Sequence, residues 1–114
     1  MAWGYHLLLD LKNCKNISDI AIEKFVIELL PKIRMNPVGV PHIEYLLPKT
    51  SNAGYSMVQM IQTSNLTAHF VDATREGYVD LFSCKQFDQQ VVIDVATKCF
   101  QPESIKHTFL ERQA

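Results

Sequence analysis

The sequence is poor in the features that mark several classes of protein. Three cysteines, Cys14, Cys84 and Cys99, are an odd number at unrelated spacings, so neither a disulfide framework nor a CxxC metal clip is expected. With 11 Lys and Arg against 12 Asp and Glu, the net charge of −1 gives no basic excess for nucleic acid. The N-terminal apolar run lacks a basic leader and is interrupted by Asp10, which argues against a signal peptide or a membrane span. We therefore expect a cytoplasmic protein that needs no metal and binds neither nucleic acid nor membrane.

What is present is typical of a globular chain. Hydrophobic residues make up 47% and charged residues 20% of the 114 residues, both close to the globular average. A chain of this length buries enough apolar surface to fold without a covalent staple. We therefore expect one domain that spans residues 1–114.

Two segments have the apolar spacing of amphipathic helices. In the first, over about residues 18–34, six apolar residues form one continuous stripe: Ile22, Phe25, Val26, Leu29, Leu30 and Ile33. Ser18 or Asp19 is suited to cap its start, and Pro31 is expected to kink or end it. The second helix is predicted over about residues 88–100, with Asp88 as its N-cap.

Most of the rest is predicted to form strands. They are expected at residues 4–11, 38–47, 55–62, 66–72, 78–84 and 105–110. Turns are expected at residues 63–65 and 75–77, and such short connections favour antiparallel pairing. The order β-α-β-β-β-β-α-β predicts an α+β fold: a two-layer sandwich of one antiparallel sheet with two helices packed on one face. The other face would stay open for a partner.

Four segments carry a resemblance to a known family. GYHLLLDLKNC, AGYSMVQMIQTSNLTAH and GYVDLFSC are similar to three motifs of the prokaryotic-type S-adenosylmethionine decarboxylases, and HTFLERQ is a weaker match. The motifs read G-x-H-L with an acidic residue and a cysteine, then G-x-S before E-S-H-L-T-x-H, and G-Y-x-x-V-D-x-F-T-C. The resemblance covers most of the chain and implies a pyruvoyl-dependent carboxy-lyase that supplies polyamine (spermidine) synthesis.

The resemblance also implies a route to the cofactor. In this family the hydroxyl that matches Ser64 attacks the carbonyl that matches Thr63, and elimination from the resulting ester cuts the chain between the two residues. Residue 64 then becomes a pyruvoyl group, which forms a Schiff base with the substrate amine and acts as the electron sink. Neither pyridoxal phosphate nor a metal is required.

Three further positions match functional residues of the family. His69 matches the base in the elimination, Ser56 a serine that assists processing, and Cys84 the cysteine that protonates the product carbon. Strand alternation places His69 on one face with Thr67 and Val71. Cys14 and Cys99 are interpreted as structural thiols, and His6, His42 and His107 as structural or exposed.

The sequence departs from the family around the predicted site. Thr63 stands where the family has an acidic residue before the cleaved serine, and Asn65 where it has a histidine. Val71 and Ala73 occupy the positions of a tryptophan that stacks on adenine and a glutamate that holds the sugar. Leu46 occupies the position of a second stacking aromatic, and each lost ring costs about 1–3 kcal/mol of stacking. The cleavage residues are thus retained while the adenosine contacts are not.

These departures leave the substrate open at this stage. Leu46, Val71, Asp10 and Asp72 are the candidate substrate-binding residues, and the carboxylates suit a second positive charge. The family suggests S-adenosylmethionine; the alternatives are the same chemistry on arginine or ornithine, or an unprocessed relative that binds a ligand or regulates a processed partner. The resemblance also implies a homodimer in which two sheets face each other and share their sites.

Overall fold

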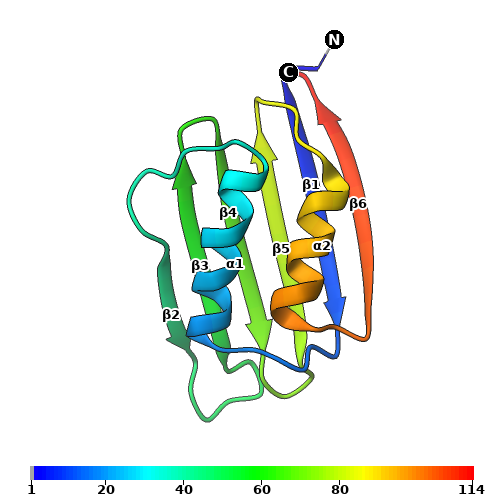
Figure 1. The fold of residues 1–114 in the computed structure, drawn as a ribbon. Coiled ribbons are helices and arrows are strands. Elements are labelled where there is room, and N and C mark those ends of the chain that lie inside the picture. Colours follow the sequence, from blue (N-terminus) through cyan, green and yellow to red (C-terminus); the bar gives the residue numbers. More distant parts are fainter. Residues whose placement is uncertain (1) are drawn as a thin grey trace.

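The computed structural model describes residues 2–114 and has the predicted order of elements (Figure 1). In chain order these are β1 (Gly4–Lys12), α1 (Asp19–Lys32), β2 (His42–Leu46), β3 (Gly54–Ile61), β4 (Ser64–Val71), β5 (Glu76–Ser83), α2 (Gln89–Phe100) and β6 (Ser104–Arg112). The six strands form one sheet in the order β2-β3-β4-β5-β1-β6, and every neighbouring pair is antiparallel. The predicted α+β sandwich is therefore confirmed.

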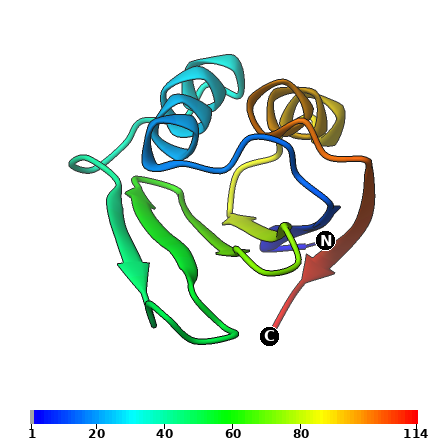
Figure 2. The ribbon, with the colours of Figure 1, turned by 90° about the horizontal axis from the view of Figure 1, so that it is seen from below.

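Both helices lie side by side on the same face of the sheet (Figure 2). The Ser18 hydroxyl accepts a hydrogen bond from the Ala21 N–H and begins α1, and the Asp88 carboxylate caps α2 through the Gln90 N–H. Pro31 lies in the last turn of α1, which ends one residue later, so the proline ends the helix rather than breaking it.

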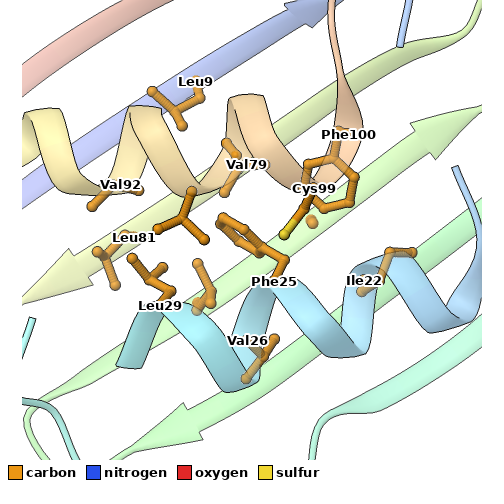
Figure 3. Close-up of a cluster of buried hydrophobic side chains, with 14 of the residues drawn as sticks. Leu9, Ile22, Phe25, Val26, Leu29, Val79, Leu81, Val92, Cys99 and Phe100 are labelled. Atoms are coloured by element: carbon orange, nitrogen blue, oxygen red, sulfur yellow. The ribbon is translucent and has the colours of Figure 1, made fainter. Parts of the chain in front are cut away.

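The core fills the space between the helices and the sheet (Figure 3). Phe25 of α1, Phe100 of α2 and Phe70 of β4 meet there, with ring centroids 5.1 Å apart for Phe25–Phe100 and 4.7 Å for Phe70–Phe100. Leu29 and Leu81 are fully buried beside them. This apolar layer holds the helices against one face and leaves the other face of the sheet uncovered.

The clearest differences from the predicted boundaries lie in two turns and one strand. The turn expected at residues 63–65 is a two-residue turn at positions 62–63, because Ser64 pairs with both Ile61 and Ser83 and so begins β4. The next turn falls at residues 72–75 rather than 75–77. The long strand predicted at 38–47 is only five residues long, and a single bridge from Pro37 to Ile61 precedes it.

Candidate active site

The predicted nucleophile, Ser64, directly follows the two-residue turn between β3 and β4. Ser64 shares the side of the sheet that faces the helices, as its partner Ser83 does. Its hydroxyl donates a hydrogen bond to the sulfur of buried Met35 (3.3 Å) and lies 2.9 Å from the Thr63 hydroxyl. Ser64 is thus held in a partly buried position at the start of a strand, not in a free loop.

The carbonyl that precedes Ser64 has two donors around it. The Thr63 oxygen accepts a hydrogen bond from the Cys84 N–H at 3.0 Å and a longer one from the Ser83 hydroxyl at 3.4 Å. Ser83 is fully buried, and its Oγ accepts in turn from the Lys85 N–H at 2.9 Å. Donors that converge on a carbonyl polarise it and stabilise negative charge on its oxygen. The sequence predicted neither Ser83 nor this arrangement, although the neighbouring Cys84 marked the segment.

Ser56 and His69 form a second cluster, on the open face. They are direct cross-strand neighbours on β3 and β4, and Ser56 Oγ lies 2.8 Å from His69 Nδ1. His69 is exposed and Ser56 half-buried. The hydrogen bond fixes the orientation of the imidazole ring, which suits a histidine that moves a proton.

One chain does not bring these two clusters together. Five residues separate Ser64 from His69 along β4, which is about 17 Å at the rise of a strand. An odd number of steps also places their side chains on opposite faces. The predicted set of Ser56, Ser64, His69 and Cys84 is therefore divided within a single chain.

The three cysteines differ in burial. Cys84 is exposed just after β5, whereas Cys14 and Cys99 are buried, and all three thiols are free. Burial raises the pKa of the Cys14 thiol to about 11 against the lowering effect of Arg75. Burial, followed by the Glu28 carboxylate, also raises the pKa of Cys99. Buried thiols of raised pKa are unreactive, so the structure supports their interpretation as packing residues.

Leu46 and Val71 lie on the open face one row beyond Ser56 and His69. Gly54 pairs with Leu46 on one side, and it packs so closely on β4 that an added Cβ would lie 1.7 Å from the Phe70 oxygen. The two aliphatic side chains therefore flank a flat glycine floor. Neither side chain is aromatic, so this row offers no ring that could stack on a substrate.

The two predicted carboxylates lie on different sides of the sheet. Asp10 is exposed on the open face, opposite Tyr78. Asp72 follows the last residue of β4 and accepts a hydrogen bond from the Tyr45 hydroxyl at 2.6 Å, which raises the Tyr45 pKa. Tyr45 packs edge-on against Tyr55, which borders the core. Asp72 therefore belongs to a side-chain cluster on the helix side of the sheet, whereas Leu46 and Val71 lie on the open face.

Two further features of the open face were not predicted. Tyr78 lies directly opposite His69, and its partial burial and the Glu76 carboxylate raise its pKa. His6 and Asp80 are hydrogen-bonded across the same face, with His6 Nε2 and Asp80 Oδ1 3.0 Å apart. Alternation along β5 would have placed Tyr78 and Asp80 on one face, because residues two apart in a strand point to the same side of the sheet. The pairing of Tyr78 with His69 makes this the face of the site.

The comparisons with known proteins agree with the fold. A family model described as S-adenosylmethionine decarboxylase matches residues 5–113, almost the whole chain. The chain belongs to the S-adenosylmethionine decarboxylase family. Among solved structures, 22 chains match. One is the adenosylmethionine decarboxylase of Aquifex aeolicus VF5, at 18% identity and a TM-score of 0.79, over 99% of this chain and 92% of that one. At this identity the match supports the fold alone. No curated protein matches the sequence.

Membership of the S-adenosylmethionine decarboxylase family gives the chain its function. It is a decarboxylase of S-adenosylmethionine, a small-molecule substrate, and the reaction supplies polyamine synthesis. Within residues 2–114, no group of three or more His, Cys, Asp or Glu side chains is arranged to hold a metal ion. None of the helices described is long and apolar enough to cross a bilayer.

Proposed function

We propose that this S-adenosylmethionine decarboxylase matures by cutting itself between Thr63 and Ser64. The observation that carries the proposal is the pair of donors on the Thr63 carbonyl, the Cys84 N–H at 3.0 Å and the Ser83 hydroxyl at 3.4 Å. They support attack on this carbonyl because the oxygen becomes negatively charged when the carbon turns tetrahedral. The Thr63 hydroxyl, 2.9 Å from Ser64 Oγ, supports the orientation of the nucleophile.

The cleavage balances without an external reagent other than water. Ser64 Oγ bonds to the Thr63 carbonyl carbon, the peptide C–N bond breaks, and an ester forms. A base then removes the proton from the Cα of residue 64, and the Thr63 carboxylate leaves. Water replaces the nitrogen of residue 64, ammonia is released, and residues 64–114 begin with a pyruvoyl group. That group supplies the electron sink for decarboxylation.

The protein's own residues are assigned roles around that group. Ser56 holds His69, which is the base for the Cα proton of residue 64. Cys84 returns a proton to the product carbon, since its thiol is exposed at the end of β5. Leu46 and Val71 flank the substrate, and Asp10 faces its positive charge. Three free cysteines support a reducing compartment, the cytoplasm.

We infer that the working unit is a homodimer whose sites are shared. Ser64 and His69 lie on opposite faces about 17 Å apart along one strand, so a second copy must bring its His69 to the Ser64 of the first. The uncovered face carries exposed apolar side chains on three strands, which supports burial against another sheet. They are Val58, Met60, Tyr78 and Leu110.

Co-expression of two inactive chains tests this proposal. Ser64→Ala cannot be cut, and His69→Ala lacks the base; each should remain whole when expressed alone. In a mixture, about half of the His69→Ala chains should pair with a Ser64→Ala chain and be cut, if pairing is random. Tags of different mass and intact mass spectrometry identify which chain is cut.

A matched control and two contrary outcomes complete the experiment. His107→Ala replaces an exposed histidine of β6 outside the site and should be cut as the wild type is. Cleavage of His69→Ala alone would remove His69 from the mechanism. A mixture that stays whole, although mixed dimers are present, would contradict shared sites.

A further inference from the structure

Trp3 is an exposed aromatic ring at the end of the sheet where β1 begins and β6 ends (Figure 1). Its N–H donates to the Arg112 carbonyl at 2.9 Å, which ties the residue to β6. The indole is 61% exposed, more than any other aromatic side chain among residues 2–114. A large ring left in water forgoes the free energy that burial would give it. Trp3 is therefore suited to a contact that the chain does not make with itself.

Phe82 supports the Trp3 ring from one side. The two rings are stacked, with their centroids 6.0 Å and their planes 25° apart. Phe82 lies close over the β1 backbone at Gly4, where an added Cβ would be 2.7 Å from the Phe82 ring. The Arg112 guanidinium lies 5.0 Å from the centroid of the same ring. Phe82 is thus engaged by its neighbours, and Trp3 is the ring of this cluster that offers a free face.

A cavity of about 660 Å³ lies beside this ring, with Trp3 and Phe82 in its wall. A volume of this size holds a small organic molecule. A smaller hollow of about 240 Å³ shares Phe82 with the cavity and is also lined by Asn65, which pairs with Phe82 across β4 and β5. Because Asn65 directly follows Ser64, the two spaces link Trp3 to the residue proposed to become the pyruvoyl group.

The substrate of this family carries the kind of group that such a ring binds. S-adenosylmethionine has a planar adenine at one end and the reacting amino acid at the other, and every base has a π-face that stacks on aromatic side chains. The row of Leu46 and Val71 offers no ring. We propose that Trp3 stacks on the adenine of S-adenosylmethionine while the amino acid end lies at residue 64. This inference rests on the proposed role of Ser64, but the ring contact itself does not require that the chain has been cut.

Fluorescence of the wild-type protein tests this contact directly, because Trp3 is the only tryptophan of the sequence. The probe 5′-methylthioadenosine keeps the adenine and the sugar but lacks the amine that reacts with a pyruvoyl group. S-methylmethionine keeps a sulfonium and the amino acid but lacks the ring. With excitation where adenine does not absorb, 5′-methylthioadenosine should quench the emission saturably, and S-methylmethionine should leave it unchanged. Intact mass of the same sample reports cleavage, so failure of self-cleavage and failure of stacking are separate readings.

Variants then measure what the ring contributes to the reaction. Trp3→Leu should raise the KM for S-adenosylmethionine about 10-fold with kcat little changed, since the lost stack is a binding contact remote from the reacting atoms. Trp3→Phe keeps a ring and should recover most of the loss. Ile27→Ala is the matched control, because Ile27 is 60% exposed on α1 outside this cavity, and should keep the wild-type KM.

Several outcomes would overturn the proposal. They are an emission that 5′-methylthioadenosine does not quench, equal quenching by S-methylmethionine, and a Trp3→Leu variant with the wild-type KM. An emission that shifts on dilution of the protein but not with 5′-methylthioadenosine would assign Trp3 to a contact between two copies instead. The wild-type titration decides the matter even if Trp3→Leu does not mature.

Discussion

Replacing Ser83 with alanine removes one of the two donors to the carbonyl that the proposed self-cleavage attacks. The Ser83 hydroxyl donates to the Thr63 oxygen at 3.4 Å, while the Cys84 N–H donates to the same oxygen at 3.0 Å. Removing a well-placed donor to an oxyanion typically costs about 10²- to 10³-fold in rate. The Ser83 contact is the longer of the two, and the Cys84 N–H remains in the variant. We therefore expect Ser83→Ala to be cut about 10-fold more slowly, which corresponds to ~1.4 kcal/mol in the barrier.

The rate is measured as the appearance of the fragment 64–114 after pulse labelling in cell-free translation. Ser83→Thr keeps the hydroxyl, and it is the residue that the family motif has at this position, so it should restore the rate. Cys84→Ala is the informative control. It removes the thiol but keeps the backbone N–H, so it should be cut at the wild-type rate and then fail in decarboxylation.

Two results would refute this reasoning. If Ser83→Ala matures within two-fold of the wild type and melts normally, the hydroxyl does not act on the carbonyl. If Cys84→Ala also matures slowly, the contribution of Cys84 comes from its side chain and not from its N–H. A melting temperature measured on uncut chains separates both results from a failure to fold.

Three further substitutions test the packing, the buried thiol and the substrate clamp. Gly54→Ala should lower the free energy of unfolding in urea by about 3 kcal/mol or more, because the new Cβ would lie 1.7 Å from the Phe70 oxygen. The control Gly39→Ala has open space around it but a φ of +78°, so it should cost about 1 kcal/mol. Equal losses in the two variants would contradict the packing argument. The pKa of the Cys14 thiol rises from 9.0 to about 11 on folding, so between pH 9 and 11 this thiol ionises only in the unfolded chain. The free energy of unfolding should therefore fall there by up to about 1.4 kcal/mol per pH unit. Cys14→Ala should flatten that slope, and an unchanged slope would assign it to another group. Val71→Trp should restore a stacking ring and lower the KM for S-adenosylmethionine about ten-fold; if arginine or ornithine reacts faster and this variant slows that reaction, the substrate is a basic amino acid.

The sequence predicts most of the fold because its helices and strands have distinct periods. The apolar stripe from Ile22 to Ile33 and the capping residues Ser18 and Asp88 are local signals, and the structure confirms them within two residues. The β3–β4 turn was misplaced for an equally physical reason. The polar run at residues 62–65 contains no glycine and looks like one loop, but the ladder partners of Ser64 on two neighbouring strands extend β4 to that residue.

The site is harder to predict because its contacts join distant segments. The resemblance pointed to Ser64 and Cys84, but only the folded chain brings Ser83, 20 residues along the sequence from Thr63, to the Thr63 carbonyl, and Met35 to the Ser64 hydroxyl. Alternation correctly placed His69 and Val71 on one face. The same rule assigns Ser64 to the opposite face once β4 is known to begin there, and this separation is what the proposed homodimer would bridge.

The geometry of β4 also separates the residues proposed for cleavage from the positions proposed to contact the substrate. Ser64 begins the strand and Val71 ends it, about 23 Å away at the rise of a strand and on the other face. A substitution at Val71 or Leu46 therefore leaves the Thr63 carbonyl of its own chain, with its Cys84 and Ser83 donors, undisturbed. In the proposed homodimer the clamp of one copy would serve the Ser64 of the other, so a change of clamp acts on the substrate across the interface and not on the turn that is cut.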